Sequence, residues 1–130
     1  MIGLGSFYAN LSNLICKMDL QGQAMLTGDL AHSVTLKVLA SSHIFVRSAR
    51  YDGDCISLRE AIKLGVPAIA TDTGMRPQEA VLFPIGDEES LLKRLEEAAS
   101  YPSRQKMTSF ESDLSSLAEV ERILAECAKR

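Results

Sequence analysis

The order of hydrophobic and polar positions along the chain predicts helices that alternate with short apolar strands. In several stretches apolar side chains recur every three to four positions, as they do in amphipathic helices. The predicted helices cover about residues 9–18, 31–40, 55–64, 88–100 and 114–128. The predicted strands are residues 24–26, 43–47, 67–71 and 80–83, and residues 1–5 have the pattern of a strand end that runs into a glycine turn.

The predicted strands are apolar on both sides, which is typical of a parallel sheet that helices cover on both faces. We therefore predict an α/β fold with a Rossmann-like, doubly wound parallel sheet. In such folds the ligand binds at the carboxyl ends of the strands. A polar stretch that contains Pro102 separates two predicted regions, a domain over residues 1–110 and a C-terminal helix within residues 111–130 that packs on it.

Two residues are expected to mark helix ends in this domain. Gly65 lies where a helix favours a residue with a positive φ at its C-terminal end. Asp87 is expected to cap the helix over residues 88–100. The side chains of that helix expected to face inward are Leu91, Leu92, Leu95 and Ala98.

Composition excludes several classes of protein. A chain of 130 residues with 46% hydrophobic and 24% charged residues is long enough for one domain with a hydrophobic core. Its formal net charge of −3 gives no reason to expect nucleic acid as a partner. No apolar run approaches the roughly 20 residues that span a bilayer. Three separated cysteines, two histidines and no C-x-x-C pair predict a reducing cytoplasm and no metal site.

The segment from Tyr51 to Pro67 carries the candidate chemistry, because it joins a strand to a helix through a turn that contains Gly53. Backbone N–H groups at the start of such a helix can hold phosphate. If the helix begins near Cys55, Glu60 lies about 7.5 Å further along its axis, at roughly 1.5 Å per residue. This spacing favours a diphosphate at the helix start and a ribose whose hydroxyls donate to the Glu60 carboxylate.

Structural interpretations of the same residues stay open. Ser57-x-x-Glu60 is also the pattern of a capping box, and either Asp54 or Ser57 could be a plain N-cap. Gly53 could be a simple turn glycine. Cys55 is expected to pack as a small hydrophobic residue, because no base is evident that would make it a reactive thiolate.

Arginines near this segment have two expected roles. The four arginines are Arg47, Arg50, Arg59 and Arg76, and arginines in such loops are mostly expected to be solvated. Arg50 and Arg76 nevertheless flank loops at the predicted ligand edge, so they are the local candidates for neutralising the charge of a phosphate.

Residues 44–74 resemble the donor-binding half of the family 4 (group 1) retaining glycosyltransferases of the GT-B fold. These proteins carry an acidic residue, seven intervening residues and Glu-Ala, followed by a Gly-x-Pro strand start. Here Asp52 and Glu60-Ala61 have this spacing. Gly65-Val66-Pro67 opens the next strand, which ends in Thr71-Asp72-x-Gly74. A weaker resemblance extends over most of the chain.

The resemblance implies a role for each matching residue. Glu60 would bind the ribose, and Asp52 would contact hydroxyls of the transferred sugar. The other implied donor-binding residues are a loop against the base (Gly28, Asp29, Leu30), a segment that holds the diphosphate (Gly53, Asp54, Cys55, Ile56, Ser57) and a loop near the sugar and phosphates (Thr73, Gly74). The implied reaction moves a hexose from a UDP-, GDP- or ADP-sugar to an acceptor with retention, without a metal or other cofactor.

Departures from the family pattern limit what the chain is expected to do alone. Asp52 replaces the usual Glu and is one methylene shorter, Cys55 stands where a second glycine is common, and Asp54 adds a carboxylate beside the diphosphate. In the family, a strand–helix unit with the phosphate-binding Arg and Lys precedes the Gly-x-Gly turn, as does an N-terminal acceptor domain. Neither matches this sequence. We therefore expect little activity from the isolated chain, which would need that domain or a partner chain.

Other functions stay open. The chain could be a non-catalytic nucleotide-sugar-binding or scaffold subunit whose last helix docks on a partner chain. A receiver- or flavodoxin-like signalling domain is disfavoured, since an acidic pair should follow the first strand, where Gly3-Leu4-Gly5 lies. A sheet that begins one strand late is expected to expose an edge, through which the chain could form a homodimer. We expect a cytoplasmic protein, with peripheral membrane association as the alternative.

Overall fold

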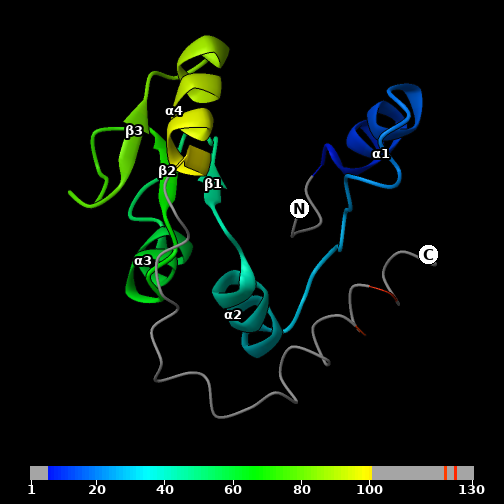
Figure 1. The fold of residues 1–130 in the computed structure, drawn as a ribbon, viewed down its shortest axis with the longest axis horizontal. Coiled ribbons are helices and arrows are strands. Elements are labelled where there is room, and N and C mark those ends of the chain that lie inside the picture. The colour runs from blue at the N-terminus through cyan, green and yellow to red at the C-terminus, as the bar shows by residue number, and fades with distance from the viewer. Residues whose placement is uncertain (1–5, 101–121, 123–124, 126–130) are drawn as a thin grey trace. The chain divides into compact units, whose positions relative to one another are not determined.

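The computed structural model describes residues 6–100, Arg122 and Ala125 (Figure 1). The chain divides into two compact units, one of residues 38–112 and one of residues 1–37 with 113–130. We call residues 38–100 the α/β unit and residues 6–37 the N-terminal unit. The predicted strand end at residues 1–5 and most of the helix predicted over residues 114–128 lie outside the described residues. The predicted domain boundary near residue 110 stays a prediction.

The α/β unit is built on three parallel strands in the order β1–β2–β3. They are β1 (Phe45–Arg47), β2 (Ala68–Thr71) and β3 (Val81–Phe83). All of β2 is buried, because it is the central strand and has a neighbour on each side. The predicted α/β fold with a Rossmann-like parallel sheet is confirmed.

Helices connect and cover these strands. α3 (Ile56–Lys63) links β1 to β2 and packs against both, whereas α4 (Glu88–Ser100) follows β3 and packs against it. α2 (His32–Ser41) precedes β1 and contributes one buried side chain. The buried apolar cluster of the unit consists of Leu39, Cys55, Leu58, Ala61, Val66, Ala68 and Ala70. This cluster includes residues of α3 and β2, and through Cys55 it holds the last residue of the loop that precedes α3.

The two predicted helix ends are formed as expected. Gly65 follows the last residues of α3 with φ of 73°, a conformation that costs glycine little, and its N–H donates to the carbonyl of Ile62 at 3.0 Å. Asp87 precedes α4, and its carboxylate accepts from the N–H of Ser90 at 2.9 Å and from the Ser90 hydroxyl at 2.7 Å. These hydrogen bonds lower the pKa of Asp87 below its ordinary value.

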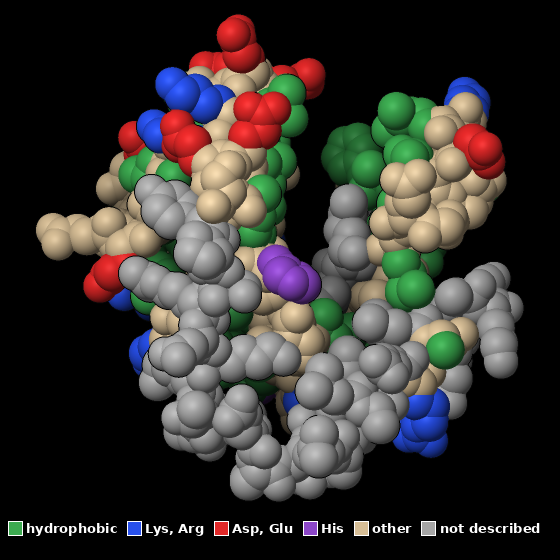
Figure 2. Space-filling view, in the orientation of Figure 1, with side chains coloured by type: hydrophobic (Ala, Val, Ile, Leu, Met, Phe, Trp, Pro, Cys, Tyr) green, Lys and Arg blue, Asp and Glu red, His purple; other side chains and the backbone are tan. Residues whose placement is uncertain are grey.

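The prediction for the inward face of α4 is wrong at one position. Leu91, Leu95 and Ala98 are half-buried, but Leu92 is exposed. Leu92 lies one residue after Leu91, so the 100° step of the helix turns it away from the sheet. Acidic and basic side chains gather over the exposed side of α4 (Figure 2).

The N-terminal unit contains one predicted helix and lacks one predicted strand. α1 (Tyr8–Lys17) matches the helix predicted over residues 9–18. The predicted strand over residues 24–26 is wrong, because these residues are irregular and form no ladder with any described residue. An isolated bridge at Gly28 follows them. An apolar run becomes a strand only when a neighbouring strand pairs with its backbone, which its own sequence does not show.

Candidate functional site

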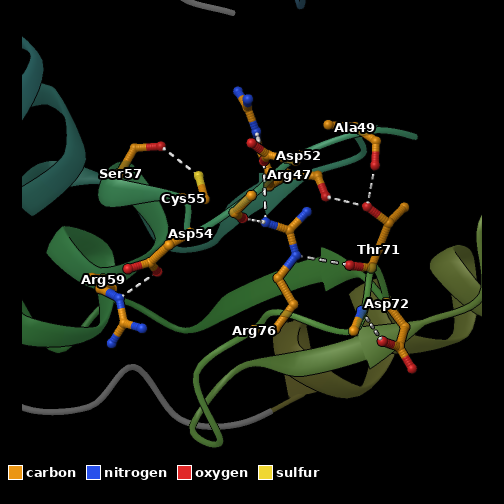
Figure 3. Close-up of polar contacts among 12 residues, drawn as sticks. Arg47, Ala49, Asp52, Asp54, Cys55, Ser57, Arg59, Thr71, Asp72 and Arg76 are labelled. Atoms are coloured by element: carbon orange, nitrogen blue, oxygen red, sulfur yellow. Dashed lines mark hydrogen bonds and ion pairs between the residues drawn. The ribbon is translucent and has the colours of Figure 1, made fainter.

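The candidate site lies at the carboxyl ends of β1 and β2, where two loops meet (Figure 3). We call them the β1–α3 loop (residues 48–55) and the β2–β3 loop (residues 72–80). Because β1 and β2 are parallel neighbours, the loops that follow them leave the same edge of the sheet. This is the edge at which ligand binding is predicted.

Thr71 joins the ends of the two strands. Its side chain is buried at the end of β2, and its hydroxyl donates to the carbonyl of Ala49 at 2.5 Å. The hydroxyl oxygen is also 3.5 Å from the carbonyl of Arg47. A threonine at this position therefore fixes the first residues of the β1–α3 loop against β2.

Asp52 is the electrostatic centre of the site. Its Oδ2 accepts from Arg47 Nε at 2.9 Å and from Arg76 Nη1 at 3.1 Å (Figure 3). The hydrogen bond from Arg47 is the largest cause that lowers the pKa of Asp52, and Arg76 adds to it, although partial burial opposes them. In return, the hydrogen bond to Asp52 raises the pKa of Arg47. Asp52 is therefore a carboxylate at neutral pH.

Arg76 comes from the β2–β3 loop and reaches across to the β1–α3 loop. Its Nε donates to the carbonyl of Thr71 at 3.0 Å, and its Nη1 lies 3.4 Å from the carbonyl of Gly53 as well as near Asp52. Only 1% of its side chain is exposed. Its Nη2 is buried and has no hydrogen-bond partner among the described residues. The general expectation of a solvated arginine is therefore wrong for Arg76, whereas Arg50 is exposed. The role of either arginine toward a phosphate stays a prediction.

The start of α3 carries no side-chain cap. Cys55 is the N-cap residue, with an extended backbone (φ −78°, ψ 105°), and no side chain accepts a capping hydrogen bond there. Ser57 lies inside the helix, with its Oγ 3.2 Å from Cys55 Sγ. The carboxylate of Asp54 accepts instead from Arg59 Nε at 2.6 Å. Both capping interpretations, the Ser57-x-x-Glu60 box and the Asp54 or Ser57 N-cap, are thus wrong.

The remaining predicted residues of the α/β unit surround this helix start. Cys55 is buried in the apolar cluster, as expected of a small hydrophobic residue, and Glu60 is half-buried on α3. Gly53 is exposed, and a Cβ on it would meet nothing within 4 Å. In the β2–β3 loop Gly74 has φ of 80° and donates its N–H to Asp72 Oδ1 at 3.0 Å. The hydroxyl of Thr73 is buried without a hydrogen-bond partner among the described residues.

Sequence reasoning missed how Asp52 is held. Arg47 and Arg76 both pair with it, and neither arginine was expected to bind a carboxylate. The only available hint was that the loops after two predicted neighbouring strands leave the same edge of the sheet, and this does not show which side chains pair there. Gly28, Asp29 and Leu30 belong to the N-terminal unit, so their part in the site stays a prediction. Gly28 is buried with φ of 69°.

Two other kinds of feature are absent from the part of the chain that the structure describes. No group of three or more His, Cys, Asp or Glu side chains is arranged to hold a metal ion there. Within the same residues, no helix has both the length and the apolar character required to cross a membrane.

Comparisons with known proteins identify the kind of chain to which this site belongs. The family model described as "Glycosyl transferases group 1" matches residues 1–110. The chain is also 28% identical over 102 residues to a phosphatidylinositol N-acetylglucosaminyltransferase subunit from Arabidopsis thaliana. That similarity covers 75% of this chain and 23% of the relative, so the chain spans about a quarter of the length of the curated relative it matches.

Proposed function

The chain belongs to the group 1 glycosyl transferases, and from this premise we propose that it binds a nucleotide-sugar donor as the donor half of a retaining glycosyltransferase. The observation that carries the proposal is the start of α3. The helix start lacks a side-chain cap, and at Gly53 just before it a Cβ would meet nothing within 4 Å. It also follows the Asp52 carboxylate, which two arginines hold. A donor has a diphosphate that suits the uncapped helix start and sugar hydroxyls that suit the carboxylate.

The diphosphate would lie at the start of α3. The first N–H groups of an α-helix have no intrahelical acceptor, and the helix dipole favours negative charge at this end. Gly53 allows a close approach, because nothing within 4 Å occupies the space of a Cβ there. In the proposed reaction these N–H groups stabilise the leaving diphosphate, a role that a metal has in other transferases.

Two carboxylates would bind the sugars of the donor. Asp52 accepts hydrogen bonds from hydroxyls of the transferred sugar through Oδ1, because both arginines meet Oδ2. Glu60, about a turn into α3, accepts from the ribose hydroxyls. We propose that Thr73 and Gly74 line the sugar and phosphates, and that Gly28, Asp29 and Leu30 lie against the base.

A second candidate function is a non-catalytic subunit that binds a nucleotide sugar or a partner chain. It is favoured by the relative from Arabidopsis thaliana, whose name makes it one subunit of a transferase. Under both candidates the acceptor would be positioned by a region outside this chain.

An NMR titration with UDP-, GDP- and ADP-sugars tests the donor site. We expect saturable shifts at Gly53 to Glu60 with one of the three donors. They should be lost in Glu60→Ala and kept in Glu96→Ala, which removes an exposed glutamate from α4. Absence of shifts at millimolar donor, or equal shifts in both variants, would contradict the donor site. The second candidate function would then be tested by purifying the chain with its partner.

A further inference from the structure

We propose that Arg76 is a positioning residue of the donor site, which ties the β1–α3 loop to the end of β2 and thereby determines which oxygen of Asp52 faces the donor sugar. This inference rests on the proposed function and adds a residue to it. Arg76 itself would not touch the donor, since only 1% of its side chain is exposed.

The contacts of Arg76 connect its own β2–β3 loop to the β1–α3 loop and to the end of β2. Its Nη1 reaches Asp52 Oδ2 at 3.1 Å across 24 residues, and the carbonyl of Gly53 at 3.4 Å across 23 residues. Its Nε donates to the carbonyl of Thr71 at 3.0 Å. One guanidinium therefore connects the acid proposed for the sugar, the glycine proposed for the diphosphate and the last residue of the central strand.

The orientation of Asp52 follows from these contacts. Both cations meet Oδ2, so Oδ1 is the oxygen left to accept from a ligand. Arg47 alone would hold the carboxylate less firmly, because 43% of its side chain is exposed and water screens its charge. The buried Arg76 is the contact that limits rotation of the carboxyl group.

The shape of the guanidinium, and not only its charge, is needed for this role. Arg76 uses two nitrogens on two edges of a planar group to reach Thr71 and Asp52 at once. A lysine ammonium is a compact charge at the end of a flexible chain and does not reproduce this fork. Lysine at position 76 should therefore keep the electrostatic effect on Asp52 while losing the fixed geometry.

The experiment compares Arg76→Lys, Arg76→Gln and Arg47→Gln, the last being the matched loss of a cation from the same oxygen. Two quantities are measured by NMR: the donor Kd and the carboxyl pKa of Asp52 in the donor-free chain. We expect Arg76→Gln to raise the Kd about tenfold, or about 1.4 kcal/mol, and to raise the pKa of Asp52. Arg76→Lys should keep the pKa low with a similarly raised Kd, whereas Arg47→Gln should change the Kd less than about threefold.

The outcomes separate this inference from the proposed function. Wild-type affinity in a folded Arg76→Lys chain would overturn the positioning role, and so would a larger loss of affinity in Arg47→Gln. If Arg76→Gln fails to fold, Arg76→Lys carries the test. If the wild-type chain binds no donor, the proposed function fails. The Asp52 pKa then still tests the contact, and an unchanged pKa in Arg76→Gln would overturn it.

Discussion

Two carboxylates of the β1–α3 loop form similar ion pairs in opposite surroundings. In the buried pair Asp52 binds Arg76, and their side chains are 17% and 1% exposed. Two residues later Asp54 pairs with Arg59, and their side chains are 53% and 51% exposed. The exposed pair is the shorter one, 2.6 Å against 3.1 Å. Burial, and not distance, therefore decides which pair holds the loop, because water and salt screen an exposed pair.

The two pairs also differ in what they connect. Arg59 is five residues from Asp54 and lies on the helix that the loop enters, so this pair is local. Arg76 is 24 residues from Asp52 and joins two loops. Bringing together residues that are further apart in the sequence costs the chain more conformational entropy. The β1–α3 and β2–β3 loops therefore stay together only while the contacts between them are formed.

Removing Arg76 from the buried pair should destabilise the fold most. Arg76→Gln should lower the free energy of unfolding by about 2–4 kcal/mol, because it leaves Asp52 short of one cation and two carbonyl groups short of a donor. Urea unfolding followed by circular dichroism measures it. Arg59→Gln, the matched change in the exposed pair, should stay within about 0.5 kcal/mol of the wild type. Equal losses in the two variants would contradict the role assigned to burial.

Acidification should reduce the difference in unfolding free energy between the wild type and Arg76→Gln. Because the pKa of Asp52 is lowered in the folded chain, its pairing stabilises the fold above the unfolded carboxyl pKa of about 3.9. This contribution is lost as the pH falls through the folded pKa. The gap in unfolding free energy between the wild type and Arg76→Gln should therefore narrow between neutral and acid conditions. Asp87 also has a lowered pKa, but it is present in both chains and cancels in the comparison.

A pair of glycine changes should extend the comparison from the β1–α3 loop to the β2–β3 loop. Gly74→Ala should cost about 1 kcal/mol of unfolding free energy, because φ of 80° strains any residue with a Cβ. Gly53→Ala should cost less than about 0.5 kcal/mol, since its Cβ meets nothing within 4 Å. The same Gly53→Ala chain should nevertheless bind donor more weakly, which calorimetric titration would show. Unchanged affinity would mean that the diphosphate does not approach this glycine.

Most of the α/β unit could be predicted from the sequence because its signals are local. The strands over residues 45–47, 68–71 and 81–83 have apolar runs, and Asp87 and Gly65 mark helix ends with residue types that suit those positions. The strand expected at residues 24–26 failed because pairing with another strand is not a local property. Leu92 failed because a run of leucines does not show which one faces the sheet.

Some features of the candidate site could likewise be predicted from the sequence, and others could not. The positions of Asp52, Gly53 and Glu60 around a helix start follow from local order, and the structure has them there. The cap of α3 could not be chosen from the sequence, because several neighbouring polar residues suit the position equally well. The pairing of Arg76 with Asp52 depends on how two loops approach at one sheet edge, and no spacing in the sequence expresses that approach.

Removing Arg59 from the exposed pair should change the donor affinity only slightly. Asp54 adds a carboxylate near the proposed diphosphate, and Arg59 offsets it at 2.6 Å. Arg59→Gln should therefore raise the donor Kd by less than about threefold at low salt, since the uncompensated charge repels the diphosphate only through a screened medium.

Adding Asp54→Asn to that variant should restore the wild-type affinity. In the single variant Arg59→Gln, salt at about 0.5 M should remove the difference in Kd from the wild type. The Kd values of this double-mutant cycle, measured at low and high salt, give the coupling energy directly. If Arg59→Gln weakened binding more than Arg76→Gln did, the exposed pair and not the buried pair would position the donor. The assignment of roles along the loop would then be reversed.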